Sequence, residues 1–412
     1  MIEPDPHPTT VNAESLERLR TVMGRLDPTR PIQRPDQQPW YVQRPDGFSN
    51  RLGRTLQIDP TSTHLVVGSI GSGKSTELLA AGRVVLGTPG VYARYVEVTR
   101  VMALESASAE ALVLAVVDDL VGHLAQGVPG DAEIIQLQEE LSPWVNGYWK
   151  DSPGFRQLVS DALTVPKAGQ FVEPRLKRPE AGTSIPRTDW LERCWTLVQR
   201  LRKGRLAWLI DGLDRIADPI EFDRIVEPFL HALKAAGIGV VVVGPRRSIA
   251  GLDRLGVADT FDEIHMVHPI DRRQPEGERF LHEVLSRRGV DEVSTAEARE
   301  FLVARSGGAI RILLQLTKEA IKQAWISNEE QARLPHAELA AYRTGRSLLW
   351  GLSDAELKLL QALVKTGEFA PRTAEELALV LTNRVMDYED SSMQPRYAAH
   401  PTLVRFLAAL PG

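Results

Sequence analysis

The sequence predicts an α/β fold with a mostly parallel β-sheet, and two observations carry this prediction. From His64 onward, short apolar runs alternate with helical stretches, as they do in units of a strand and a crossover helix. The four consecutive valines 240–243 form a run typical of a strand that is buried on both faces, which is common in parallel sheets. Five strands are expected, at residues 65–67, 91–98, 206–210, 239–243 and 264–267.

Composition narrows the class of protein. Hydrophobic residues make up 43% and charged residues 25% of the 412 residues, which is ordinary for a globular chain. The formal net charge of -5 excludes a global basic field for nucleic acid or anionic membranes. Cys194 is the only cysteine, so no internal disulfide can form and a reducing compartment is expected. With no signal-peptide pattern and no apolar run of about 18 residues, we expect a cytoplasmic protein without a membrane span.

The pattern along the chain suggests four segments. The first part is proline-rich around one amphipathic stretch, and the strands stop after Pro269, where helical periodicity takes over. Near the C-terminus, turn-forming residues separate two short apolar pieces within 384–400, which predicts a two-stranded hairpin. The expected segments are an N-terminal arm (1–45), an α/β core (46–270) with an irregular insertion (168–187), a helical segment (271–330) and a C-terminal domain (331–412).

The strongest functional motif follows the first strand. Residues 64–76 read HLVVGSIGSGKST and contain G-x-x-x-x-G-K-[ST] between a strand and a helix, the context that a phosphate-binding loop requires. Its glycines let successive N–H groups point at phosphate oxygens, and the following helix adds its positive end. The residues expected to bind ATP or ADP are Gly68, Ser69, Ile70, Gly71, Ser72, Gly73, Lys74, Ser75 and Thr76. Among them, Lys74 should reach the β- and γ-phosphates, and the Ser75 hydroxyl should bind Mg²⁺.

Two acidic residues follow the third strand. Asp211 ends the apolar run LAWLID, at the edge where open α/β sheets present their ligands, and is expected to help hold Mg²⁺, as the Walker B aspartate does. Asp214 is close enough along the chain to polarise the water that attacks the γ-phosphate. The alternative is structural: Asp211 would end a strand and Asp214 would cap a helix.

Two arginines are candidates for sensing the γ-phosphate. Arg246 follows the fourth strand at the same sheet edge, and Arg247 could replace it. Arg311 opens a helix after the glycine turn at 307–308, so it can be directed toward the phosphates. A solvated basic turn and a surface arginine are the structural alternatives.

In order along the chain, these motifs resemble those of the AAA+ and STAND branches of P-loop ATPases. GSIGSGKST is similar to a Walker A motif, LAWLIDGLD to Walker B, VVVVGPR to sensor 1 and GGAIR to sensor 2. The resemblance covers roughly residues 46–325 and is closest to replication-initiator, transposition-regulator and STAND ATPases. It implies a sheet of order 5-1-4-3-2, a helical lid and a C-terminal winged-helix domain.

The resemblance also implies self-assembly, in which one subunit donates an arginine to the ATP of its neighbour. Arg254 is the best-placed candidate for this role, with Arg215 and Arg247 as alternatives. Many AAA+ proteins carry Asp-Glu in Walker B, whereas Gly212 follows Asp211 here. This departure is more STAND-like and predicts slow hydrolysis, because a displaced carboxylate positions water less well.

The leading hypothesis is an ATP-controlled oligomerisation switch that recruits or activates a protein effector, in bacterial defence, mobile-element control or signalling. His400 is similar to a histidine with which some STAND proteins sense bound diphosphate. A second hypothesis is a DNA-binding loader or motor that uses the winged helix and the basic residues 175–178. A third, a kinase-like phosphotransferase, would need a second substrate site, for which the sequence has no signature.

Overall fold

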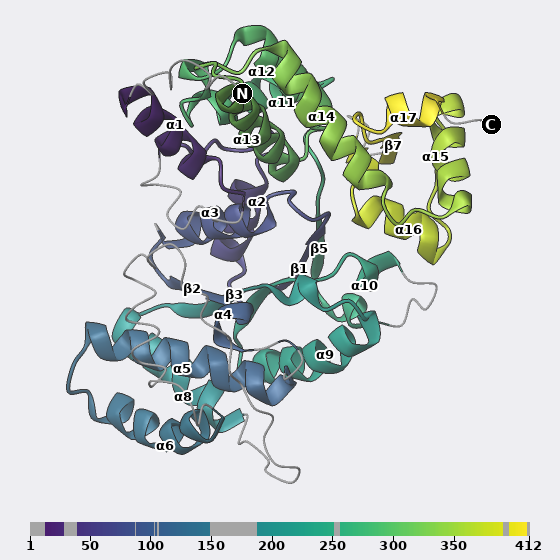
Figure 1. Cartoon of the computed structure of the whole chain (residues 1–412). Coiled ribbons are helices and arrows are strands. Elements are labelled where there is room, and N and C mark those ends of the chain that lie inside the picture. The colour runs from purple at the N-terminus through teal and green to yellow at the C-terminus, as the bar shows by residue number, and fades with distance from the viewer. Residues whose placement is uncertain are drawn as a thin grey trace, which may run out of the picture. The chain divides into compact units, whose positions relative to one another are not determined.

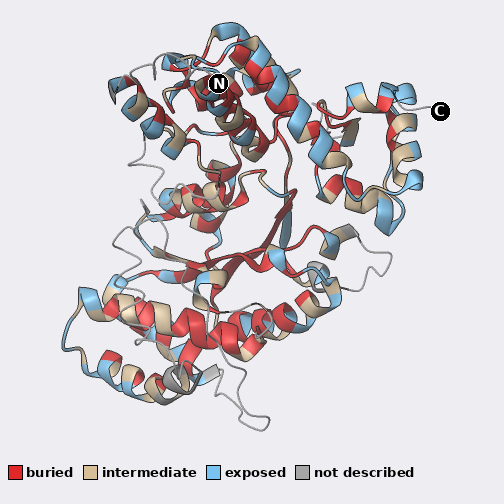
Figure 2. Ribbon diagram, in the orientation of Figure 1, coloured by how far each residue is buried: buried red, intermediate tan, exposed pale blue. Residues whose placement is uncertain are grey.

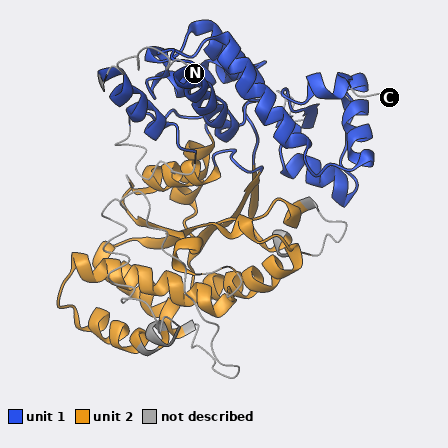
Figure 3. Cartoon of the chain, in the orientation of Figure 1, with its two compact units in different colours: residues 1–47, 69–73, 267–412 blue, residues 48–68, 74–266 orange. Residues whose placement is uncertain are grey.

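The computed structural model describes residues 13–28, 39–86, 88–102, 104, 107–148, 188–250, 256–389 and 395–409. By their contacts, the residues divide into two compact units (Figure 3). We call residues 48–68 and 74–266 the sheet unit, and residues 1–47, 69–73 and 267–412 the helical unit. The glycine-rich loop therefore belongs by its contacts to the helical unit, although the strand and helix that flank it belong to the sheet unit. The division into four segments stays a prediction.

The sheet unit contains a five-stranded sheet with the order β2-β3-β4-β1-β5 (Figure 1). Its strands are β1 (Thr63–Gly68), β2 (Val91–Glu97), β3 (Arg205–Asp211), β4 (Gly239–Val243) and β5 (Glu263–Val267). The pairs β1–β4, β2–β3 and β3–β4 are parallel, and every residue of β1 and β4 is buried. The predicted α/β class and the order 5-1-4-3-2 are confirmed.

Helices cover both faces of this sheet. In Figure 1, α2 and α3 lie on one face and α5, α8 and α9 on the other. α5 is apolar on most of its surface and largely buried, and Figure 2 shows it as a mainly red ribbon. Asp218 caps α9 by accepting from Ile220 N, ahead of Pro219 at the first helical position. The helices are α2 (Phe48–Ile58), α3 (Lys74–Leu86), α4 (Val98–Val101), α5 (Ala109–Gly127), α6 (Ala132–Tyr148), α8 (Thr188–Arg202), α9 (Pro219–Ala235) and α10 (Arg247–Ala250).

The helical unit has its own core, built mainly by five helices. They are α1 (Ala13–Arg25), α11 (Pro275–Ser286), α12 (Ala296–Arg305), α13 (Ile310–Ile326) and α14 (Leu334–Leu349). The stretch expected to be an arm contributes to this core, because Leu19, Val22 and Leu26 are buried in the same cluster as Leu281 and Leu313. α1 is thus held by the burial of its apolar face, and not by helix propensity alone.

A smaller cluster forms the C-terminal part of the helical unit. It comprises α15 (Asp354–Thr366), α16 (Ala374–Leu381), α17 (Val404–Ala409) and the antiparallel pair β6 (Val385–Glu389) and β7 (Pro395–Ala399). Ser353 and Thr373 start α15 and α16 with capping boxes. The predicted hairpin within 384–400 is therefore present. None of the described helices is both long and apolar enough to cross a membrane.

Candidate nucleotide-binding site

The glycine-rich loop between β1 and α3 has the backbone of an anion-binding loop. Gly71 and Gly73 have φ values of +82° and +99°, a conformation that favours glycine. The N–H of Ser72 donates to the carbonyl of Ser69 at 3.2 Å, which closes a tight turn. Turns of this kind aim successive N–H groups into one concavity, and α3 adds its N-terminal end there.

The carbonyl groups of the same loop are held by residues of the helical unit. Three consecutive carbonyls accept hydrogen bonds: Ile70 from Asn383 Nδ2 (3.0 Å), Gly71 from Arg311 N (3.4 Å) and Ser72 from Arg44 Nη1 (2.8 Å). A trans peptide holds its C=O and N–H in opposite directions, so fixing a carbonyl also fixes where the next N–H points. These donors therefore help to set the direction of the loop's N–H groups.

Two of these donors, Arg44 and Asn383, were missed from the sequence. Arg44 is buried, and its guanidinium also donates to the Asp46 carboxylate and the His268 carbonyl. Asn383 follows α16 with φ +57°, a conformation that asparagine tolerates better than most residues. Asparagine after a helix indicates a helix end, but no sequence signal links these residues to a loop that lies 28 and 313 positions away.

Lys74 and Asp214, two predicted site residues, lie in direct contact. Lys74 Nζ is 3.0 Å from Asp214 Oδ2 and donates to the Gly68 carbonyl, also at 3.0 Å. Asp214 is placed by a short 3₁₀ helix (Leu213–Arg215) that follows Gly212, whose φ is +92°. The lysine side chain is 6% exposed and the aspartate 24%, so the pair is partly shielded from water. A phosphate that enters the loop would compete with Asp214 for the ammonium group.

Asp211 is the last residue of β3 and is 4% exposed. Its Oδ2 accepts from the Tyr95 hydroxyl at 2.7 Å, and its Oδ1 accepts from Gly212 N at 2.8 Å. Burial, and next the charge of Asp211, raise the pKa of Tyr95, so this hydroxyl stays protonated and donates. Each carboxylate oxygen keeps a lone pair for a cation, and with the Ser75 hydroxyl it provides the oxygen ligands that Mg²⁺ prefers. Tyr95 was not predicted, because β2 carries no motif.

Arg246 lies at the edge of the sheet where β1 ends. Val243 of β4 is paired with Val66 of β1, and Gly244 N donates to the Val66 carbonyl at 3.0 Å. The residues after β4 thus reach the edge from which the glycine-rich loop begins. Arg246 is buried, whereas Arg247 is exposed, so burial favours Arg246 of the two candidates. Its sensing role stays a prediction.

Arg311 is placed against the glycine-rich loop by the first turn of α13. A Cβ atom added to Gly71 would lie 2.4 Å from Arg311 Cβ, so only glycine fits beside this arginine. Arg311 Nε is buried and has no hydrogen-bond partner among the described residues. Ser72 Oγ in the loop is in the same condition. Buried polar atoms without a partner are uncommon, and a bound ligand, ion or water is one explanation for them.

Other predicted residues fall elsewhere. Arg254, the basic residues 175–178 and the whole insertion 168–187 lie outside the described residues. Arg215 is exposed. His400 is fully buried, with its Nδ1 2.8 Å from Thr402 Oγ1, and burial lowers its pKa to about 4. It is therefore neutral at pH 7, and the contact of its ring with Thr402 is local in the chain.

No family model and no curated protein matches this sequence. Several solved structures have a similar arrangement. One is an Aeropyrum pernix ORC2 protein in ADPNP and ADP complexes. The match has 14% sequence identity and a TM-score of 0.46, and it covers 88% of this chain and 91% of that chain. Another is a Drosophila ORC bound to DNA, which matches with 12% identity and a TM-score of 0.44. This match covers 100% of this chain and 95% of that chain. A Thermotoga maritima RuvB variant matches with 11% identity and a TM-score of 0.40. This match covers 91% of this chain and 100% of that chain.

At this level of similarity, such neighbours do not by themselves establish a function. The chain's own features are more informative: the strand order β2-β3-β4-β1-β5, a Walker A loop after β1, and an aspartate at the end of β3. Together they give this chain the fold of P-loop ATPases of the AAA+ type.

Proposed function

We propose that this chain is a nucleotide-controlled switch that binds ATP and hydrolyses it slowly. The observation that carries the proposal is the double engagement of the glycine-rich loop. Its carbonyls are bonded to Arg44, Arg311 and Asn383 of the helical unit, while Lys74 at its end is paired with Asp214. A loop fixed in this way can pass a change at the phosphates to distant parts of the chain.

Nucleotide binding rests on residues 68–76. The N–H groups of the loop and the Lys74 ammonium would hold the β- and γ-phosphates of ATP, and later those of ADP. Mg²⁺, held by Ser75 and Asp211, would neutralise charge on the phosphate oxygens. The hydrogen bond from Tyr95 to Asp211 orients the carboxylate for this task, as outer partners of metal ligands commonly do.

Hydrolysis requires an attacking water and stabilisation of the leaving phosphate. In the proposed step, water attacks the γ-phosphorus, the bond from phosphorus to the β–γ bridging oxygen breaks, and ADP and phosphate form. Asp214 would accept the proton of the water, while Arg246 and Arg311 would stabilise the charge on the γ-phosphate. To act as the base, Asp214 must first break its ion pair with Lys74, and this requirement is consistent with slow turnover.

The output of the switch is self-assembly and recruitment of an unidentified protein effector. Arg254 of one subunit would contact the ATP of the next, as the resemblance to AAA+ and STAND proteins implies. The C-terminal elements α15–α17 with β6 and β7 would form a winged-helix domain. Bacterial defence, mobile-element control and signalling are roles that suit such a switch.

A sizing experiment tests this proposal. The full chain is compared with ADP, with a slowly hydrolysed ATP analogue and without nucleotide, beside Lys74→Ala as a control that lacks the phosphate-binding cation. We expect the analogue to raise the mass of the wild type only, because assembly depends on the bound triphosphate. Equal masses in all samples, despite nucleotide binding measured by calorimetry, would contradict the switch.

A DNA-binding loader is the alternative function. The acidic composition of α16, which immediately precedes the hairpin, argues against it, because Glu375 and Glu376 are its only charged residues. Binding of DNA that is strong at low salt, weakens steeply with added salt and is lost when Arg175, Lys177 and Arg178 become alanine would favour the loader. No binding at low salt would remove it.

A further inference from the structure

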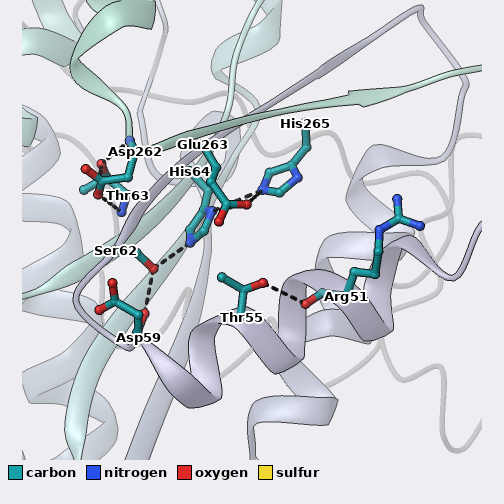
Figure 4. Close-up of polar contacts among 9 residues, drawn as sticks. All are labelled: Arg51, Thr55, Asp59, Ser62, Thr63, His64, Asp262, Glu263 and His265. Carbon is teal, nitrogen blue, oxygen red and sulfur yellow. Dashed lines mark hydrogen bonds and ion pairs between the residues drawn. The ribbon is translucent and has the colours of Figure 1, made fainter. Parts of the chain in front are cut away.

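Figure 4 shows a second cluster of polar side chains, which includes His64. His64 lies near the N-terminal end of β1, whereas the glycine-rich loop follows its C-terminal end. His64 is the second residue of β1, and Glu263 and His265 are alternate residues of β5, so their side chains share one face of the sheet. Among the described residues, this is the only group of three or more histidine, cysteine or carboxylate side chains whose ligand atoms could reach one metal ion.

The separations of the ligand atoms are close to those around a tetrahedral zinc ion. His64 Nδ1 is 3.1 Å from His265 Nε2 and 3.9 Å from Glu263 Oε2, and the last two atoms are 3.5 Å apart. Nitrogen and oxygen ligands at about 2.0–2.2 Å from zinc lie roughly 3.3–3.6 Å from each other in a tetrahedron. The separation of His265 from Glu263 lies within this range, that of His64 from His265 is shorter and that of His64 from Glu263 is longer, so small side-chain movements would complete the geometry.

The hydrogen bonds around His64 favour the tautomer that can bind a metal ion through Nδ1. Ser62 Oγ donates its one proton to the Asp59 carbonyl at 2.6 Å. In its second contact, 2.7 Å from His64 Nε2, the hydroxyl must therefore act as the acceptor, so Nε2 carries the proton of the imidazole. The lone pair of the ring is then on Nδ1, which faces the other two ligands. Histidines that bind metals are usually held in this manner by a partner on the second nitrogen.

The exposure of one ligand leaves one route of access to the cluster. His64 is fully buried, whereas the Glu263 side chain is 49% exposed, so an ion and one water ligand can arrive beside Glu263. The alternative is a hydrogen-bonded pair in which His265 Nε2–H donates to His64 Nδ1.

We propose that His64, His265 and Glu263 bind one zinc ion that links the edge strand β5 to β1. Two imidazole nitrogens and one carboxylate oxygen are a common zinc ligand set, and water would take the fourth position. His64 precedes Gly68 by four residues, which places it roughly 13 Å from the loop along the strand, so the zinc and nucleotide sites are separate. β5 is the last strand before the helical unit, and the ion would stabilise this end of the sheet.

Zinc titration of the untagged full chain tests the proposal. The protein is stripped with a chelator, kept free of nucleotide and titrated by calorimetry in excess Mg²⁺, and its melting temperature is followed in parallel. We expect one equivalent of Zn²⁺ and a rise in melting temperature. His265→Ala should weaken binding by about 100-fold or more and abolish the rise, and Glu263→Gln should weaken it by about 10-fold.

His231→Ala is the matched control. His231 is exposed on α9 in the same unit, and its Nε2 is 3.8 Å from Glu227, so it is a histidine beside a carboxylate with no third ligand among the described residues. This variant should bind zinc as the wild type does. His265→Ala must keep its circular dichroism spectrum and its affinity for nucleotide, which separates loss of a ligand from loss of the fold. Absence of zinc binding in the wild type, or equal affinity in His265→Ala, would overturn the proposal.

Discussion

The two ends of β1 present opposite solutions to binding a charged group. At its C-terminal end, the candidate anion site is made largely of backbone, with glycines at positive φ and one lysine. At its N-terminal end, the candidate zinc site is made only of side chains, from β1 and from β5. A backbone site needs consecutive residues of special conformation, whereas a side-chain site needs only that strands pair. The first is therefore visible as a motif, and the second becomes visible only with the fold.

Removing the lysine should have the largest effect and should affect one end only. We expect Lys74→Ala to lower ATP hydrolysis by about 1,000-fold, equivalent to about 4 kcal/mol, because the cation that faces the transferred phosphate is lost. Phosphate release measures this loss. Zinc binding at the other end should be unchanged. A parallel loss of zinc binding would show that the two ends are not independent.

Adding one methyl group to the loop should have the next largest effect. We expect Gly71→Ala to weaken nucleotide binding by about 100-fold, because φ is +82° and the new Cβ would lie 2.4 Å from Arg311 Cβ. Gly130→Ala is the matched control, since Gly130 has φ +90° and nothing within 4 Å of the added atom. Calorimetry should show normal affinity in the control. Equal losses of nucleotide affinity in both variants would mean that backbone strain, and not the close contact with Arg311, causes the loss.

Asp214→Asn should have a smaller effect, which raises the affinity for ADP and lowers the rate of hydrolysis. Without the carboxylate, phosphate no longer competes with Asp214 for the Lys74 ammonium group, so ADP should bind about 3- to 10-fold more tightly. Hydrolysis should fall by about 10-fold, because the proton acceptor is lost. Calorimetry and phosphate release measure the two effects on one preparation. Turnover of tens per second in the wild type, with no change in the variant, would contradict both the slow mechanism and the role of Asp214.

Much of the fold could be predicted because its signals are local. The valines of β4 and the strand–loop–helix at 63–86 indicate buried parallel strands, and the order of the sheet followed from a resemblance carried by these motifs. Lys74 and Asp211 were proposed as site residues from the same local motifs. Arg44, Tyr95 and Asn383 were missed, because their contacts join distant parts of the chain and their types are unremarkable locally. The packing of α1 into the helical core depends likewise on partners more than 250 residues away.

The three donors to the loop carbonyls have a practical consequence for dissecting this protein. Arg44, Arg311 and Asn383 all lie outside residues 46–270, the span that a biochemist would choose as a minimal ATPase fragment. Such a fragment would keep every Walker residue and still lose the donors to the loop carbonyls. Its nucleotide affinity would then describe an unsupported loop, so enzymology should be done on a polypeptide that contains all three donors.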